Sequence, residues 1–507
     1  MFNNARMQRS RRAGWKSTAL ALIIGGTLSF AVQPARAQST LDLPDLGDSS
    51  TRALSSERER EYSEGLLRQL RNFDITMEDP QLLEYLETLA YRLVQASGRG
   101  ETDFTFALIE VPLINAFASP GGLVVVFTGL ILATENESEL AGVMAHEIAH
   151  VSQRHIARAM ESSMEESLPI LLGAIALAMA AQGSGDGAQA ALVGGMALIQ
   201  QRQINFTRDN EYEADRVGIQ TLAKAGFDPA GMGDFFARIG SIYRTQGEEV
   251  PEFLRTHPVT AARVAEAKGR AEKLRTGTQL TSLEFMLMRE RVRVISSHDL
   301  PAVVNYYEEN QGNGKIDKRA LQYGLGLARI RSGAYEEARS AFEKLSAADP
   351  ARLSYQLALA EVDRGQRRFK AADQRYQRLL SERPGHRVVS IAYARSLIEH
   401  DTVASGALAV SALRPLMTRF PNDPQLFELF ARANQLGGDD VRAAEAYAQA
   451  FFLRGKFEDA MKQLEQTAAR ADLDYYQRAR IDAQLAQWSP VVLRERGKLE
   501  EQERRGG

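Results

Sequence analysis

One short stretch of the chain, AGVMAHEIAHVSQRHIARAM, contains residues whose types and spacing fit metal-dependent hydrolysis. His146, Glu147 and His150 form the pattern H-E-x-x-H. Residues four apart lie on one face of an α-helix, so both imidazoles can bind one zinc ion, and Glu147 beside them can act as general base. The alternative is three polar residues on a surface helix. His155 falls off this face and is expected to be a surface residue.

A third ligand is expected from the downstream segment EYEAD. Glu211 and Asp215 are four residues apart on a predicted helix. A catalytic zinc takes three protein ligands, so we expect Glu211 to be the third, while Asp215 accepts a hydrogen bond from a ligating histidine. Glu147 and Asp215 then form the predicted catalytic set. Glu213 is expected to be ordinary surface, and a solvated helix face is the alternative for the whole acidic cluster.

Helices and a few strands are predicted around these residues. Residues 55–73 and 79–97 have helical periodicity, and residues 103–134 predict two or three strands with a tight turn at Pro-Gly-Gly. Residues 138–163 predict one long helix that carries the histidine motif, because no proline or glycine follows Gly142 there.

The chain after about residue 310 repeats itself with a period of 34 residues. Small residues recur where two helices would cross, with an aromatic residue four positions after the second small residue, a pattern typical of tetratricopeptide repeats. About four stacked pairs would form a solenoid with a groove for peptides or protein surfaces, and generic helical bundling is the alternative. The matched positions are Gly326 and Ala360, Tyr335 and Phe369, Ala338 and Ala372, Phe342 and Tyr376, Leu345 and Leu379, and Pro350 and Pro384.

The N-terminus predicts export. Five basic residues precede an apolar run and the small-x-small site Ala35-Arg36-Ala37, which is typical of a secretory signal peptide cut after Ala37. A retained anchor and twin-arginine export are alternatives. Residues 1–37 hold six basic and no acidic residues, so the formal charge of −3 becomes −9 in the mature chain. This charge gives no indication of a nucleic-acid partner.

The absence of cysteine excludes disulfides, thiolate ligands and a cysteine nucleophile. No apolar run after residue 37 reaches the roughly 18 residues of a membrane span, so a soluble periplasmic protein is expected. Two shorter apolar runs, at 170–181 and 188–199, predict a helical hairpin. This hairpin, within 168–200, is a buried core element, a flap over the active site or a peripheral membrane contact.

HEIAH at 146–150 and EYEAD at 211–215 together resemble the gluzincin metallopeptidases related to the CAAX prenyl protease. The resemblance covers roughly residues 60–270, including NAFASPGG at 115–122. It implies that His146, His150 and Glu211 are zinc ligands and that Glu147 is the catalytic base.

A signal peptide, a soluble gluzincin domain and C-terminal repeats together resemble the periplasmic β-barrel assembly-enhancing proteases. In that group a histidine in a T-H-P segment is a regulatory ligand for the open zinc position, which here is His257 in Thr256-His257-Pro258. From its chemistry alone, His257 could also be a loop histidine or a transition-state hydrogen-bond donor.

An extended peptide substrate needs a strand with free backbone groups. Residues 122–130, GLVVVFTGL, are the candidate edge strand, with Leu123, Val124, Val125 and Val126 at its centre. An ordinary core strand is the alternative. Binding of this kind recognises the backbone of the substrate rather than its side chains, and therefore favours unfolded substrates.

These observations predict an α+β protein: a mainly helical gluzincin domain with a small β-sheet, followed by an α-solenoid. The expected function is a periplasmic endopeptidase with one Zn²⁺ that degrades misfolded or stalled outer-membrane proteins and assists their assembly, its repeats docking substrate or the β-barrel assembly machinery. The alternative is a non-catalytic chaperone with a latent zinc site. The expected divisions are a signal peptide (1–37), a metallopeptidase domain (38–280), a helical connector (281–310), the repeats (311–490) and a polar tail (491–507).

Overall fold

The computed structural model describes residues 55–98, 103–160, 208–246, 252–275 and 281–506. The described residues all belong to one compact unit, residues 52–507. The predicted signal peptide (1–37) and the predicted hairpin (168–200) lie outside the described residues. None of the helices that the structure describes is long and apolar enough to pass through a bilayer.

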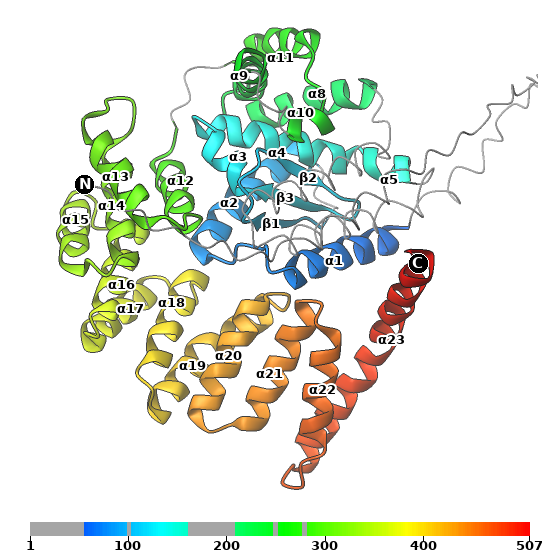
Figure 1. Cartoon of the computed structure of the whole chain (residues 1–507), viewed down its shortest axis with the longest axis vertical. Coiled ribbons are helices and arrows are strands. Elements are labelled where there is room, and N and C mark those ends of the chain that lie inside the picture. The colour runs from blue at the N-terminus through cyan, green and yellow to red at the C-terminus, as the bar shows by residue number, and fades with distance from the viewer. Residues whose placement is uncertain (1–54, 99–102, 161–207, 247–251, 276–280, 507) are drawn as a thin grey trace, which may run out of the picture. The chain divides into compact units, whose positions relative to one another are not determined.

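The first part of this unit combines helices with one small sheet (Figure 1). Its elements are α1 (Ser56–Asn72), α2 (Pro80–Ser97), β1 (Thr105–Ile109), β2 (Ala116–Ala118), β3 (Leu123–Phe127), α3 (Thr128–Ala133), α4 (Glu137–Ser152), α5 (His155–Met160), α8 (Arg208–Lys224), α9 (Ala230–Gln246), α10 (Glu252–Thr256) and α11 (Ala261–Leu274). The helices α1 and α2 were predicted, and each begins at a residue whose side chain accepts a hydrogen bond from the first turn, Ser55 and Asp79.

The sheet corrects the prediction of an edge strand at Leu123–Val126. The strand order is β1-β3-β2, so β3 is the central strand, parallel to β1 and antiparallel to β2. Every residue of β3 is buried. An unbroken run of β-branched residues is typical of a strand covered on both faces, which explains why this segment lies in the core. Among the described residues, β2 pairs with β3 alone and is therefore an edge strand.

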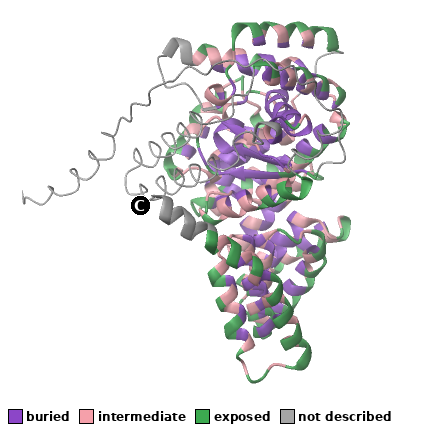
Figure 2. Cartoon of the chain, turned by 90° about the vertical axis from the view of Figure 1, so that its right-hand side faces the viewer, coloured by how far each residue is buried: buried purple, intermediate pink, exposed green. Residues whose placement is uncertain are grey.

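The histidine motif lies on α4, a helix at the centre of the core. All its residues from Ser138 to Ser152 are buried, as the purple interior of Figure 2 shows. Asn136 accepts a hydrogen bond from the backbone N–H of Glu139 and begins the helix. The prediction of one helix over 138–163 was wrong. The helix α4 ends at Ser152, Arg154 adopts a left-handed backbone angle (φ 54°), and α5 begins at His155.

The second part of the unit is entirely helical in its described residues. Its elements are α12 (Leu283–Ile295), α13 (Leu300–Glu309), a short 3-10 turn (Asn310–Gly312), α14 (Lys318–Arg331), α15 (Tyr335–Ala348), α16 (Leu353–Gly365), α17 (Phe369–Glu382), α18 (Arg387–Glu399), α19 (Val403–Arg419), α20 (Pro424–Gly437), α21 (Asp440–Leu453), α22 (Phe457–Ala468) and α23 (Tyr475–Gly506). Consecutive helices pack in pairs, which confirms the predicted fold class of a helical and β domain followed by helical repeats. The helix α23 continues across residue 490, where the sequence suggested the start of a tail.

The repeated positions lie where neighbouring helices meet. Ala338, Phe342, Ala372 and Tyr376 are all buried. A Cβ atom at Gly326 would lie 2.7 Å from the ring of Phe342, so the small residue makes room for the aromatic residue of the next helix. The 34-residue pattern therefore records how one helix of a pair crosses the other.

Candidate metal centre

Three elements bring the predicted site residues together. The helix α4 supplies His146, Glu147 and His150, α8 supplies Glu211 and Asp215, and His257 follows the end of α10. All six side chains are buried.

A glycine allows α8 to lie against α4 at the level of the metal centre. A Cβ atom at Gly218 of α8 would lie 2.6 Å from the Met232 side chain and 3.2 Å from the backbone nitrogen of His146. A larger residue would push α8, and with it the two acidic residues, away from the histidines.

Four side chains converge on one point. The Nε2 atoms of His146 and His150 are 3.0 Å apart, and the Glu211 carboxylate oxygens lie 3.6 Å from the first and 3.4 Å from the second. Nδ1 of His257 lies 3.2 Å from Nε2 of His146 and 3.1 Å from Oε1 of Glu211. All four ligand atoms lie within 4.8 Å of one another.

These separations fit a single zinc ion. With zinc–nitrogen bonds of about 2.0–2.1 Å, tetrahedral ligands lie about 3.3 Å apart. Three imidazoles and one carboxylate are also a donor set that zinc accepts. The four residues therefore have the chemistry and the spacing to hold Zn²⁺.

His146 is oriented by a chain of polar contacts through Asp215 and Arg263, called the first arm of the site. Oδ1 of Asp215 lies 3.0 Å from Nδ1 of His146, which directs Nε2 toward the cluster. Burial lowers the pKa of His146, but the nearby Asp215 and Glu211 carboxylates outweigh burial and raise this pKa to about 9. The surroundings therefore stabilise a positive charge at this position, whether a proton or a metal ion.

Arg263 of α11 completes this arm and was not predicted from the sequence. Its guanidinium donates two hydrogen bonds of 2.8 Å to Asp215, and it also lies 2.8 Å from Glu211 and donates to the carbonyl oxygen of Pro258. One buried cation thus compensates two buried carboxylates and holds the segment that carries His257. Arg263 is 48 residues from Asp215 along the chain, so no local pattern connects the two.

A second arm orients His150 and corrects the prediction that His155 is a surface residue. His155 is fully buried, and its Nδ1 lies 3.0 Å from Nδ1 of His150. Its Nε2 lies 3.3 Å from a carboxylate oxygen of Glu213, which is half-buried. If Glu213 accepts the proton of Nε2 of His155, then Nδ1 of His155 accepts from Nδ1–H of His150. Nε2 of His150 is then left with a lone pair for a metal.

The two candidate ligand histidines differ in charge. Burial lowers the pKa of His150 to about 3, so that this imidazole is neutral, the form in which histidine binds metals. Burial also raises the pKa of Glu147, whose Oε1 lies 3.5 Å from Nε2 of His257. A carboxylate with a raised pKa is a stronger proton acceptor.

The structure thus assembles six of the predicted site residues: His146, Glu147, His150, Glu211, Asp215 and His257. It does not present Leu123, Val124, Val125 and Val126 at a sheet edge. Three contributing residues were missed, namely His155, Glu213 and Arg263. The sequence signal for His155 was only its closeness to the motif.

Comparisons with known proteins agree with this geometry. Residues 80–271 match the family described as Peptidase family M48. The chain is 33% identical over 477 residues to the beta-barrel assembly-enhancing protease of Escherichia coli, covering 93% of this chain and 96% of that protein. It is 32% identical over 473 residues to the protein of the same name from Yersinia pestis, covering 92% and 96%.

A more distant similarity extends over about half of the chain. The human mitochondrial metalloendopeptidase OMA1 is 29% identical over 259 residues, which cover 50% of this chain and 48% of that protein. The similarity to bacterial proteins extends through the repeats, whereas that to OMA1 covers half the chain. The chain therefore belongs to the beta-barrel assembly-enhancing proteases of peptidase family M48 and is a zinc metalloendopeptidase.

Proposed function

We propose that this protein is a periplasmic endopeptidase that hydrolyses misfolded or stalled outer-membrane proteins and assists their assembly. The observation that carries the peptidase part is the buried cluster of His146, His150 and Glu211 beside Glu147. The names of the bacterial relatives support the link to β-barrel assembly. The signal-peptide pattern of residues 1–37 supports the compartment.

We assign His146, His150 and Glu211 as zinc ligands and Glu147 as the catalytic base. Zinc bound by these ligands would acidify a water molecule and polarise the substrate carbonyl group. Glu147 accepts the proton of the attacking water and delivers it to the leaving amine. Asp215 and His155 are positioning residues, because each contacts the nitrogen of a ligand histidine that points away from the cluster.

We place the substrate on β2 rather than on β3. Among the described residues β2 has one unpaired edge, and it packs beside α4. The backbone N–H of Ala118 in β2 donates a hydrogen bond to Glu147, which supports a substrate position next to the base. An extended chain added to this edge would be recognised through its backbone, a mode that selects unfolded segments.

We propose that His257 closes the site at rest. A catalytic zinc needs an open position, and the fourth ligand atom in this cluster is Nδ1 of His257. A substrate or partner that displaces His257 would open that position. This contact also supports the alternative function, a chaperone or scaffold whose zinc site is latent, because a closed site binds metal without catalysis.

We retain two further assignments. The repeats (311–490) contact substrate or the β-barrel assembly machinery, and the chain divides at about residues 37, 280, 310 and 490. For the segment 168–200 a peripheral membrane contact stays one alternative beside a core hairpin and a flap over the active site. The helical pairs in the second part of the structure support the first assignment, since stacked repeats present extended binding surfaces.

The test compares purified mature wild type with Glu147→Gln and His257→Ala. Cleavage of a denatured outer-membrane β-barrel protein is measured beside cleavage of a folded soluble protein. We expect slow cleavage of the denatured protein by wild type, faster cleavage by His257→Ala, and none by Glu147→Gln although this variant retains zinc. Zinc in all three without cleavage would favour the scaffold function, and cleavage by Glu147→Gln would exclude Glu147 as the base.

A further inference from the structure

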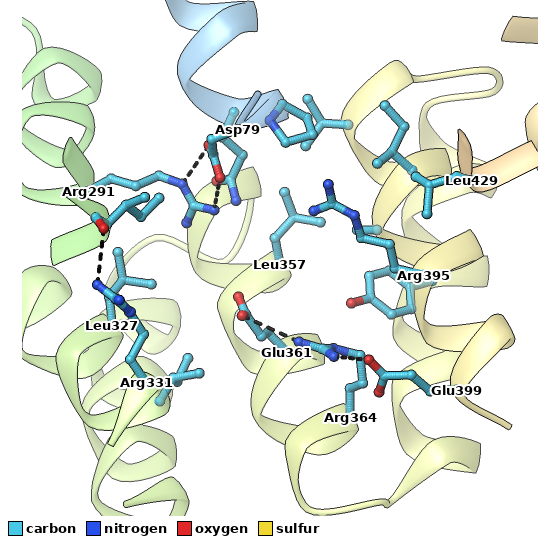
Figure 3. Close-up of a pocket in the computed structure, with 18 of the residues that line it drawn as sticks. Asp79, Arg291, Leu327, Arg331, Leu357, Glu361, Arg364, Arg395, Glu399 and Leu429 are labelled. Carbon is cyan, nitrogen blue, oxygen red and sulfur yellow. Dashed lines mark hydrogen bonds and ion pairs between the residues drawn. The ribbon is translucent and has the colours of Figure 1, made fainter. Parts of the chain in front are cut away.

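The helical repeats contain a cavity that shares no residue with the metal centre. Its volume is about 360 Å³, and it is lined by residues of α12, α14, α16, α17, α18 and α20 together with the start of α2 (Figure 3). This volume is near the lower end of the range for ligand pockets in proteins. The cavity can therefore hold only one or two chemical groups of a larger partner molecule.

The lining carries an excess of positive charge. Five arginines and three acidic residues face it, an excess of two positive charges: Arg291, Arg331, Arg364, Arg395 and Arg432 against Asp79, Glu361 and Glu399. Three of the arginines are engaged within the protein. Arg291 donates two hydrogen bonds to Asp79, Arg364 pairs with Glu361 and Glu399, and Arg331 donates to backbone carbonyl oxygens of α12 and the turn after it.

Arg432 is exposed to solvent, whereas Arg395 lies deeper in the wall and differs from the three engaged arginines. Its guanidinium extends into the cavity, and Figure 3 marks no hydrogen bond or ion pair between it and the other lining residues drawn. Asp79 and Glu361 are near enough to influence Arg395 electrostatically but already pair with other arginines. Burial lowers the pKa of Arg395, which records the loss of hydration around its charge. The Arg395 guanidinium is only partly removed from water and pairs with none of the carboxylates of this cavity, so this position can accept an anionic group of another molecule.

Part of the wall around Arg395 is apolar, beside Tyr376 and the charged residues that also line the cavity. Leu357, Val388, Ile391 and Leu429 come from three neighbouring repeat helices and line the same cavity. A ligand that satisfies both features therefore has one anionic group attached directly to an apolar body. A strongly hydrated ion would match the cation but not the walls.

We propose that this cavity, the Arg395 pocket, binds the free C-terminal carboxylate of a polypeptide whose last side chain is apolar. A carboxylate and a guanidinium form two parallel hydrogen bonds, and the last side chain then packs on the leucine and valine walls. An acidic side chain within a chain fits less well. To reach Arg395, an internal acidic side chain would carry backbone amides from both of its sides into the cavity. The last residue of a chain carries backbone amides from one side only.

This inference goes beyond the peptidase function and does not depend on it. The pocket would bind intact partner proteins as well as cleavage products, because both end in a carboxylate. The pocket is therefore testable in a protein that cannot hydrolyse peptides.

The experiment measures fluorescence anisotropy with the full mature chain carrying Glu147→Gln. The first probe is a labelled short peptide that ends in leucine with a free carboxylate. The second is the same peptide with a C-terminal amide, and the third is the amide with an internal aspartate. Arg395→Gln and Arg395→Lys are compared with Arg378→Gln, which removes an exposed repeat arginine outside the pocket.

We expect the carboxylate peptide to bind at least about tenfold more tightly than the amide, as a charge-assisted bidentate pair requires. Arg395→Gln should abolish this difference, Arg395→Lys should keep part of it, and Arg378→Gln should keep all of it. Thermal unfolding checks the fold of each variant, and Arg395→Gln should not lower the melting temperature because it breaks no ion pair marked within the pocket.

Three results would overturn the proposal. The first is equal affinity for acid and amide, or no binding of either. The second is a preference for the acid that survives in Arg395→Gln, which would assign recognition to another cation. The third is equally tight binding of the internal aspartate, which would make the pocket a receptor for acidic side chains.

Discussion

The metal centre contains a buried arginine, Arg263, and the Arg395 pocket contains a partly buried one, and only Arg263 is paired with carboxylates of the protein. At the metal centre Arg263 contacts two carboxylates and a carbonyl oxygen. In the pocket Arg395 contacts no acidic group among the described residues. A compensated network holds its residues in one geometry before any substrate arrives, as a catalytic centre requires. A guanidinium without an ion-pair partner in the protein can instead bind an anionic group of another molecule.

Replacing each arginine in turn tests whether Arg263 and Arg395 differ in their contribution to stability. Arg263→Ala leaves Asp215 and Glu211 buried without their cation, so we expect the free energy of unfolding to fall by about 3–5 kcal/mol. Arg395→Gln should leave the free energy of unfolding unchanged or slightly higher. Urea denaturation of both variants at one pH measures the difference. Similar losses in the two variants would contradict the distinction.

The two arms of the metal centre allow a finer test. His155→Ala removes the group that orients His150, and we expect the zinc dissociation constant to rise about 10- to 100-fold. Glu213→Gln keeps an acceptor for His155 and should produce a smaller rise. Competition with a chromogenic chelator measures both constants, and the melting temperature of the zinc-free proteins serves as control. An unchanged zinc affinity in His155→Ala would reduce this residue to a packing role.

The repeats should respond to overpacking without any effect on the metal. A Cβ atom at Gly406 of α19 would lie 2.6 Å from the backbone nitrogen of Gly437 at the end of α20. Gly406→Ala should therefore cost about 1–3 kcal/mol of stability. Zinc content should stay the same. Gly497→Ala is the matched control, because a Cβ atom there meets no neighbour and is expected to stabilise the helix slightly. Loss of zinc from Gly406→Ala would show that the repeats support the metal centre.

The smallest effect concerns Glu84 of α2, where a helix of the metallopeptidase part faces the repeats. Burial raises the pKa of Glu84 to about 7, and the carboxylate lies 3.7 Å from His386. Its unfolded pKa is about 4.3. Because the folded state holds this proton more tightly, stability from Glu84 is complete below about pH 4 and is lost as pH rises through 7.

Glu84→Gln should therefore be more stable than wild type at pH 8 and about equally stable at pH 4. Thermal unfolding across this range measures the effect, which is reduced because the side chain is partly exposed to solvent. A constant difference between the two proteins at all pH values would mean that the carboxyl group does not titrate as described.

The sequence was informative wherever function depends on helical spacing. Four-residue intervals correctly placed His146 with His150 and Glu211 with Asp215. The 34-residue offset located buried helix contacts such as Phe342 and Tyr376. Contacts between distant segments left no such signal. Arg263 reaches Asp215 from another helix, and the role of β3 depended on which strands lie beside it.

His155 shows how one backbone angle can invalidate a spacing argument. Counting five positions from His150 assumed a continuous helix, on which His155 would turn toward solvent. The left-handed angle at Arg154 ends that helix, and α5 then returns His155 to Nδ1 of His150. A non-glycine residue with this angle has little sequence signature, so the break could not be anticipated.

Zinc K-edge X-ray absorption of the purified mature protein tests whether His146, His150, Glu211 and His257 hold one zinc ion. Measured on wild type and His257→Ala together with metal content, it counts the imidazoles around the ion. We predict one zinc per chain, bound by three imidazoles and one carboxylate in wild type and by two imidazoles in His257→Ala. A wild-type protein without zinc, or a variant with an unchanged imidazole count, would contradict the metal centre described here.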